Sequence, residues 1–464
     1  MLSPKYSDKV ALSTHMVFLV KQVLSAVIII LCASSLFAAD KLNCEQMIAL
    51  AASGKPELKD ALLASFPEIE LKRGTAFLFH GGDFFFAVES NAQPALMIDD
   101  DAPRAMQELP GIAIWYAAVT GLRVSYDHHF HYVVDGKNFG GALDLPAFGP
   151  LSYQQPGAPS GTVSNRITFV SKVYPGMVSS YQVYVPAEYD PKVPAALMVF
   201  QDGDGYLDRE GMRPALTVID NLIAMKKIPV MIGVFVNPGD ISAAPQSPDY
   251  AFVQRYIKEN GGNLAGALRS EEYDTVTDRY NRYMYDEVLT QVEKKYNIRK
   301  DAYSRATTGI SSGGICAFNM AWFRPNEFSR VISWVGSFGA HQWKEVPGVL
   351  DGGQDYPEKI LREPHRNIRV WLADGSNDLE QRDGSWPLDN IRMANALKMA
   401  GYDFHFSFGI GAHSPAYGST QFPEEMIWLW RDYDQTKTSQ TYEMEPSEKV
   451  KPLFRVSITN RDAN

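Results

Sequence analysis

One short stretch of the sequence has the residue types and spacing of a serine nucleophile. It reads TGISSGGIC over residues 308–316, and residues 309–313 fit the pattern G-x-S-x-G with Ser311 at its centre. A strand is predicted before the stretch and a helix after it, so Ser311 is expected in a strained turn that projects its hydroxyl above a sheet. Gly309 and Gly313 would let the strand and the helix approach closely.

Ser312 could assist the same chemistry through its backbone. Its amide would lie at the helix N-terminus and point at a developing oxyanion. Ser312 is not expected to be the nucleophile, because moving the pattern by one residue loses the glycine spacing. The alternative interpretation is that the stretch is only a Ser/Gly-rich turn that caps a helix.

A serine hydroxyl needs a base, and His413 is the candidate. It lies in FSFGIGAHSPAYG (residues 406–418), on a glycine-rich loop after the last predicted strand. His405 falls within that strand and is expected to be packed.

An acid should orient the histidine, and several carboxylates compete for that role. The loop ADGSNDLEQRDGSWP after the preceding predicted strand contains Asp374, Asp378, Glu380 and Asp383. Asp378 is favoured, because the loop can turn back to His413 there and the carboxylate can stabilise the charged imidazole. Asp374 is the second choice, since it could simply bind the amides of the turn.

A second oxyanion donor is expected from the turn QDGDGY (residues 201–206), after a buried strand. The backbone amide of Asp202 or that of Gly203 is the candidate. The alternative is a calcium loop built on Asp202 and Asp204, but no glutamate follows at the EF-hand distance. No His/Cys metal cluster is visible in the sequence, so neither a metal nor a cofactor is expected.

The order of predicted elements indicates an α/β protein with a second domain. Strands and helices alternate over residues 165–434, which predicts a mostly parallel sheet with helices on both faces. Residues 40–140 predict one or two short helices followed by a small β-sandwich from residue 71. Residues 141–164 are rich in Gly, Pro and Ser and predict a linker, and residues 435–464 predict a loose polar tail.

The N-terminus has the features of an export signal. Lysines precede the apolar run VLSAVIIILCA (residues 23–33), and small residues follow, so residues 1–39 predict a cleaved signal peptide and an exported protein without stable membrane insertion. An uncleaved anchor is the alternative. The net charge of −10 and the absence of a long Lys/Arg block argue against nucleic-acid binding. No disulfide is expected between Cys44 and Cys316.

Together these motifs resemble the putative esterase family of enterochelin esterases, bacterial feruloyl esterases and esterase D. The resemblance covers roughly residues 166–433 and rests on the serine motif, QDGDGY, DGSNDLE and GAHS. It implies an α/β-hydrolase fold with Ser311, His413 and Asp378 as triad; Asp378 is the aspartate of the G-x-N-D loop. The predicted sandwich is similar to the domain that precedes the hydrolase in enterochelin esterases.

These features favour an exported serine carboxylester hydrolase acting on acyl or feruloyl esters of carbohydrates. Hydrolysis of a siderophore trilactone, acyl transfer to a sugar, and carbohydrate binding without catalysis are the alternatives. An acidic turn beside the nucleophile argues against a polyanionic siderophore. The long segment 239–277 could form a lid, and Tyr206, Tyr273 and Trp386 are candidate substrate contacts.

Overall fold

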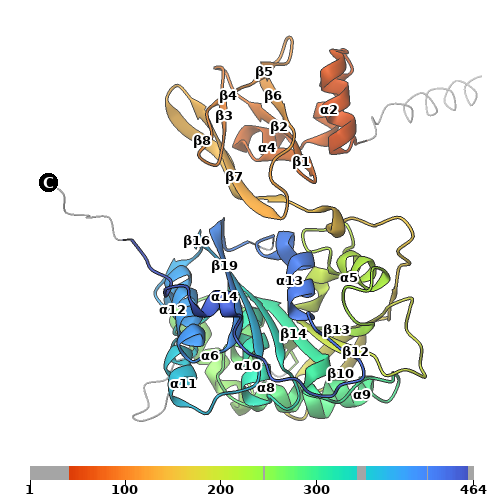
Figure 1. Cartoon of the computed structure of the whole chain (residues 1–464). Coiled ribbons are helices and arrows are strands. Elements are labelled where there is room, and N and C mark those ends of the chain that lie inside the picture. Colours follow the sequence, from red (N-terminus) through yellow and green to blue (C-terminus); the bar gives the residue numbers. More distant parts are fainter. Residues whose placement is uncertain (1–40, 244–245, 342–351, 415, 458–464) are drawn as a thin grey trace, which may run out of the picture.

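The computed structural model describes residues 41–243, 246–341, 352–414 and 416–457, and the predicted signal peptide lies outside them. Figure 1 shows two parts, a smaller N-terminal domain of helices and sheets and a larger α/β domain. Within the described residues, no helix is both long and apolar enough to cross a membrane.

The N-terminal domain has three layers: helices, a sheet and a second sheet. One antiparallel sheet has the order β1-β2-β6-β5 and the other β4-β3-β7-β8. Alternate residues of β2 (Asp83–Glu89) serve two cores, because successive side chains of a strand point to opposite faces. Phe84 and Phe86 pack between the sheets, and Phe85 packs against the helices. The other elements are α2 (Cys44–Ser53), α3 (Leu58–Ser65), α4 (Glu68–Arg73), β1 (Ala76–His80), β3 (Ala95–Ile98), β4 (Arg104–Ala105), β5 (Gln107–Glu108), β6 (Ile114–Val119), β7 (Tyr126–Val134) and β8 (Lys137–Ala147).

This domain extends further than the sequence predicts. Strand β8 continues to Ala147, so the linker predicted from residue 141 begins inside a strand, and that boundary is wrong. Gly140 and Gly141 misled the prediction: both have positive φ and bend β8 where its register with β7 shifts. A side chain at Gly141 would overlap the Phe130 carbonyl, so the glycine marks a bulge rather than a linker.

The α/β domain is built on one twisted sheet, antiparallel at one edge and parallel from β13 onward. It has the α/β-hydrolase fold. In spatial order the strands are β10 (Ile167–Val170), β11 (Val178–Val185), β13 (Met231–Asp240), β12 (Ala196–Gln201), β14 (Arg305–Ile310), β15 (Arg330–Trp334), β16 (Arg369–Asn377) and β19 (Asp403–Ala412), with β9 (Thr162–Val163) beside β11.

Helices cover both faces of this sheet, as the alternating pattern predicts. One apolar core joins it to α5 (Ala215–Ala224) and α13 (Phe422–Leu429). The other core joins it to the segment predicted as a lid and to the helices that follow. The helices of this second face are α6 (Ala251–Asn260), α7 (Leu264–Tyr273), α8 (Arg279–Arg282), the π-helical η4 (Tyr283–Leu289), α9 (Thr290–Val292), α10 (Ser312–Phe323), α11 (Tyr356–Arg362) and α12 (Trp386–Met399).

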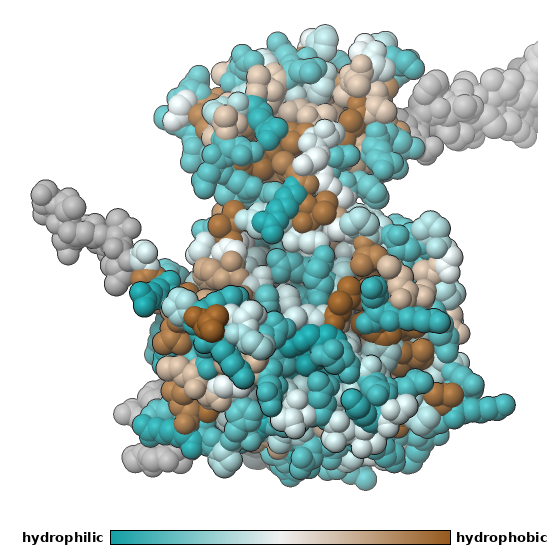
Figure 2. All heavy atoms as spheres, viewed as in Figure 1, coloured by the Kyte–Doolittle hydropathy of each residue, from teal (hydrophilic) through white to brown (hydrophobic). Residues whose placement is uncertain are grey.

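The two domains meet over a narrow junction. Figure 2 shows apolar surface on both sides of it. A cavity of about 710 Å³ lies there, lined by Phe79 and Phe148 from one side and by Arg209 and Pro214 from the other.

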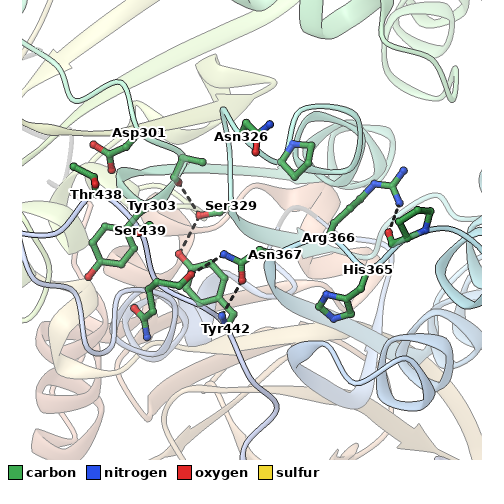
Figure 3. A pocket seen from close by; sticks show the side chains of 14 residues that line it. Asp301, Tyr303, Asn326, Ser329, His365, Arg366, Asn367, Thr438, Ser439 and Tyr442 are labelled. Atoms are coloured by element: carbon green, nitrogen blue, oxygen red, sulfur yellow. Dashed lines mark hydrogen bonds between the residues drawn. The ribbon is translucent and has the colours of Figure 1, made fainter.

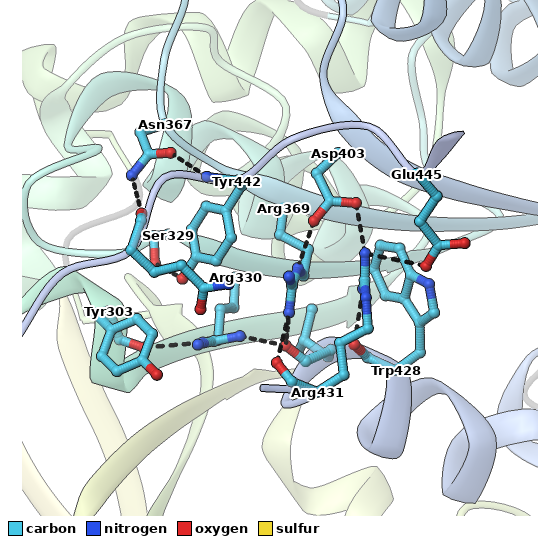
Figure 4. Close-up of polar contacts among 12 residues, drawn as sticks. Tyr303, Ser329, Arg330, Asn367, Arg369, Asp403, Trp428, Arg431, Tyr442 and Glu445 are labelled. Carbon is cyan, nitrogen blue, oxygen red and sulfur yellow. Dashed lines mark hydrogen bonds and ion pairs between the residues drawn. The ribbon is translucent and has the colours of Figure 1, made fainter. Parts of the chain in front are cut away.

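The C-terminal segment is packed rather than loose, which corrects the predicted tail. Tyr442 and Met444 are buried, and Phe454 packs against Phe404 and Phe406. Tyr442 lies over the guanidinium groups of Arg330 and Arg369 at the N-terminal ends of the parallel strands (Figure 4). The prediction failed because these apolar residues are isolated in a polar stretch and show no periodicity. A short helix, α14 (Pro446–Lys449), follows Met444.

The same segment walls a cavity of about 480 Å³ (Figure 3). Its lining includes Tyr303, Ser329 and Asn367, which precede or begin strands of the parallel sheet. This cavity therefore lies at the edge of the sheet opposite Ser311, which follows the carboxyl end of β14.

Candidate active site

Ser311 occupies the strained turn that its motif predicts. Strand β14 ends at Ile310 and α10 begins at Ser312, and Ser311 between them has φ 60° and ψ −122°. A side chain at Gly309 would overlap the carbonyl of Gly313, so only glycine lets strand and helix approach this closely. The Ser311 amide donates to the Trp334 carbonyl at 2.9 Å, which ties the turn to β15. The strain is thus held by the surrounding sheet.

Ser311, His413 and Asp378 form one hydrogen-bonded chain. Ser311 Oγ lies 2.8 Å from His413 Nε2, and His413 Nδ1 lies 2.6 Å from Asp378 Oδ1. Ser311, His413 and Asp378 directly follow β14, β19 and β16. They meet because the carboxyl ends of parallel strands lie at one edge of the sheet. With Nδ1–H donating to the carboxylate, Nε2 is left to accept the serine proton. The geometry can therefore activate Ser311 as a nucleophile.

Asp374, the second choice for the acid, contacts Asp378 instead of His413. Its Oδ1 accepts from the Gly375 amide at 2.7 Å, and its carboxyl hydrogen bonds to Asp378. Burial, together with the neighbouring charge of Asp378, raises the pKa of Asp374 well above its usual range. The raised pKa favours the neutral form of the Asp374 carboxyl, which lies beside Asp378, while Asp378 Oδ1 contacts the histidine.

The turn after β12 lies against the first turn of α10. A side chain at Gly313 would come within 3.0 Å of Asp202 Oδ2, in this turn, and 3.2 Å of Gln201 Cβ, at the end of the strand. The Asp202 amide, one of the two predicted oxyanion donors, donates to Tyr273 Oη at 3.3 Å. Gly203 is therefore the better candidate, and a side chain there would overlap the backbone of Phe235.

The carboxylates of this turn are paired with arginines. Arg269 binds Asp202 through two hydrogen bonds of 2.8 and 2.6 Å, and Arg166 donates to Asp204 at 2.7 Å. The structure therefore does not gather Asp202 and Asp204 as calcium ligands, and the acidity expected from the sequence is compensated.

The family of this chain follows from its sequence match. Residues 176–429, more than half of the chain, match the family described as "Putative esterase". The chain belongs to this esterase family. It is thus a carboxylic ester hydrolase, and the matched segment contains Ser311, Asp378 and His413.

Solved esterase structures show similarity to this esterase at low identity. The enterobactin esterase FES from Shigella flexneri is 14% identical, over 78% of this chain and 97% of that one, with a TM-score of 0.48. The ferric enterobactin esterase from Salmonella typhimurium is 13% identical, over 77% and 96%, with a TM-score of 0.48. A CE1 ferulic acid esterase from Anaeromyces mucronatus, in complex with ferulic acid, is 16% identical, over 60% and 94%, with a TM-score of 0.43.

The three aromatic residues predicted to contact substrate are all buried in this esterase. Tyr206 and Tyr273 are 0% exposed and belong to the two cores of the α/β domain, so this prediction is wrong for both. Trp386 is 2% exposed, and its ring meets the His413 ring edge-on at 5.8 Å. The Trp386 ring thus packs against the His413 ring. Large aromatic rings near a motif in sequence are frequently core residues.

The structure adds polar residues that no motif indicated. Asp274 is buried and accepts from Ser312 Oγ at 3.1 Å, and burial raises its pKa. The His341 ring meets Trp386 edge-on at 5.3 Å, and among the described residues its two buried nitrogens have no hydrogen-bond partner. Asp274 comes from the segment 239–277, whose unusual length was the only feature of the sequence that pointed to a role near the active site. Nothing in the sequence singled out His341.

Proposed function

We propose that this esterase is an exported serine hydrolase whose Ser311, His413 and Asp378 act as a catalytic triad on acyl or feruloyl esters of carbohydrates. The observation that carries the proposal is the hydrogen-bonded chain from Ser311 to Asp378 at a strained strand–helix turn. The order of motifs along the chain, with a serine after β14, an aspartate after β16 and a histidine after β19, supports the same roles.

In the proposed mechanism, Ser311 Oγ attacks the ester carbonyl while His413 Nε2 takes the serine proton. The amides of Ser312 and Gly203 stabilise the oxyanion of the tetrahedral intermediate. His413 then gives its proton to the leaving alcohol as the carbon–oxygen bond breaks, which leaves an acyl-enzyme. Water, deprotonated by His413, attacks this acyl group and releases the acid and free Ser311.

The preference for carbohydrate esters is supported by the resemblance of the serine motif, DGSNDLE and GAHS to those of feruloyl esterases. Export is supported by the N-terminal sequence alone, with its lysines followed by an apolar run.

A siderophore trilactone is the second candidate substrate, and one observation favours keeping it. Arg269 and Arg166 neutralise Asp202 and Asp204, so the turn beside the nucleophile does not present the uncompensated negative charge that would repel a polyanion.

The test compares the mature protein with its Ser311→Ala and Ser312→Ala variants. The substrates are p-nitrophenyl acetate, methyl ferulate, an acetylated xylo-oligosaccharide and a catecholate trilactone. Ser311→Ala is expected to lower kcat at least about 1,000-fold and to abolish fluorophosphonate labelling. Ser312→Ala, the matched control, keeps the labelling because its neighbour is the nucleophile.

The preferred ester identifies the substrate class, and products formed with a sugar acceptor present distinguish hydrolysis from acyl transfer. If the folded wild type cleaves no ester and resists labelling, catalysis by this triad is refuted and carbohydrate binding becomes the better explanation.

A further inference from the structure

The N-terminal domain contacts the α/β domain beside the predicted base, His413. Asp144, on β8, accepts a hydrogen bond from the Ala412 amide at 2.9 Å, across 268 positions of sequence. Two further side-chain hydrogen bonds join the domains nearby: Thr420 Oγ1 donates to Asp127 at 2.9 Å, and Ser125 Oγ donates to Glu424 at 2.8 Å. The start of β7 and the end of β8 thus contact the end of β19 and the segment that follows it.

Asp144 contacts the residue on each side of His413. The Ala412 amide, immediately before the histidine, donates to its carboxyl group; burial raises the pKa of Asp144, and the nearby side chain of Ser414 acts in the opposite direction. Asp144 therefore holds the backbone immediately before the histidine.

The loop is held from its other side by the α/β domain. A side chain at Gly411 would overlap the ring of Tyr417 and lie 2.8 Å from Asp144 Oδ1, so the chain passes through a narrow gap between the two. Tyr417 donates to the carbonyl of Asp374, and Asn377 Nδ2 donates to the carbonyl of Ile410 at 2.6 Å. The loop is thus tied to β16 on one side and to Asp144 on the other.

We propose that Asp144 is a positioning residue for His413, so that the N-terminal domain completes the active site. This inference rests on the proposed function of His413 as base. The base must lie within hydrogen-bond reach of the nucleophile, and a displacement of about 1 Å can lower a rate by about 100-fold. The 2.8 Å separation of Ser311 Oγ and His413 Nε2 is the distance that Asp144 maintains.

The test uses Asp144→Ala and Asp144→Asn in the full chain. Alanine removes the hydrogen bond from the Ala412 amide, whereas asparagine keeps an oxygen that accepts it. Ser125→Ala is the matched control, because it removes another interdomain hydrogen bond at an exposed position without touching the histidine loop. Ser311→Ala, measured in parallel, reports separately on the proposed catalytic function.

We expect Asp144→Ala to lower kcat on p-nitrophenyl acetate by about 10- to 100-fold while KM stays within about threefold. Asp144→Asn should stay within about fivefold of wild type, and Ser125→Ala should match it. Melting temperatures confirm that the variants are folded at the assay temperature. Hydrogen exchange of the peptide that contains the Ala412 amide should speed up in Asp144→Ala only, a result that does not depend on activity.

The inference is overturned if folded Asp144→Ala keeps the kcat of wild type, or if Ser125→Ala loses as much activity. It is also overturned if Asp144→Ala merely unfolds at a lower temperature, with unchanged kcat below that temperature. An active wild type with an inactive Ser311→Ala variant would then leave the proposed function standing. If wild type and Ser311→Ala are equally inactive, the proposed function and this inference fail together.

Discussion

Replacing Asp127 by asparagine would test how a buried carboxyl between the domains sets the pH dependence of stability. Asp127 lies on β7 and accepts a hydrogen bond from Thr420. Burial, reinforced by the nearby charge of Asp144, raises the pKa of Asp127 from its ordinary value of 3.8 to about 7. The folded protein therefore holds this proton over a pH range in which the unfolded chain has lost it.

The sign and size of the effect follow from proton linkage. A raised pKa in the folded state contributes stability that is fully present below about pH 4 and is lost as the pH rises to about 7. One pH unit corresponds to about 1.4 kcal/mol, so the interval from 3.8 to about 7 costs the native state about 4 kcal/mol. Asparagine carries no proton to lose and keeps an oxygen that accepts from Thr420.

Scanning calorimetry of wild type and Asp127→Asn between pH 4 and pH 8 measures this difference. In a domain of this size about 1 kcal/mol moves the melting temperature by about 2 °C. The melting temperature of wild type should therefore fall by about 8 °C relative to the variant. The control Asp135→Asn replaces an exposed carboxylate after the end of β7 and should parallel wild type. Parallel curves for wild type and Asp127→Asn would refute the assignment of a protonated Asp127.

Three further predictions test the site and the fold. Asp374→Asn keeps a donor to Asp378 and should lower kcat less than fivefold, whereas Asp374→Ala should lower it by about 10- to 100-fold; equal losses would argue against a proton shared with Asp378. Gly309→Ala drives a methyl group into the Gly313 carbonyl and should lower both melting temperature and kcat, while Gly266→Ala, where a methyl group meets nothing closer than 3.4 Å, should do neither. Tyr442→Ala should destabilise the protein by about 3–5 kcal/mol, measured by denaturant unfolding, without changing kcat at 25 °C, because its contacts lie at the sheet edge opposite Ser311. A Tyr442→Ala variant as stable as wild type would refute the stabilising role assigned to this residue.

The sequence by itself determined the fold class and the three residues of the hydrogen-bonded chain. Strand–helix alternation is a local signal, and it places Ser311, Asp378 and His413 after strands whose carboxyl ends share one edge. Glycine at positions 309 and 313 is likewise a local requirement of a tight strand–helix turn. These features could be predicted because each depends on residues close together in the chain.

Only the tertiary structure decided which neighbours each group has. Asp374 and Asp378 lie four positions apart and look equivalent in sequence, but Asp374 accepts a hydrogen bond from the Gly375 amide, whereas contact with His413 selects Asp378. Burial of Tyr206 and Tyr273 and packing of the C-terminal segment depend on cores assembled from distant elements. Asp144 reaches the histidine loop across 268 positions. Such contacts leave no periodic or local pattern, because they arise only when segments far apart in the sequence fold together.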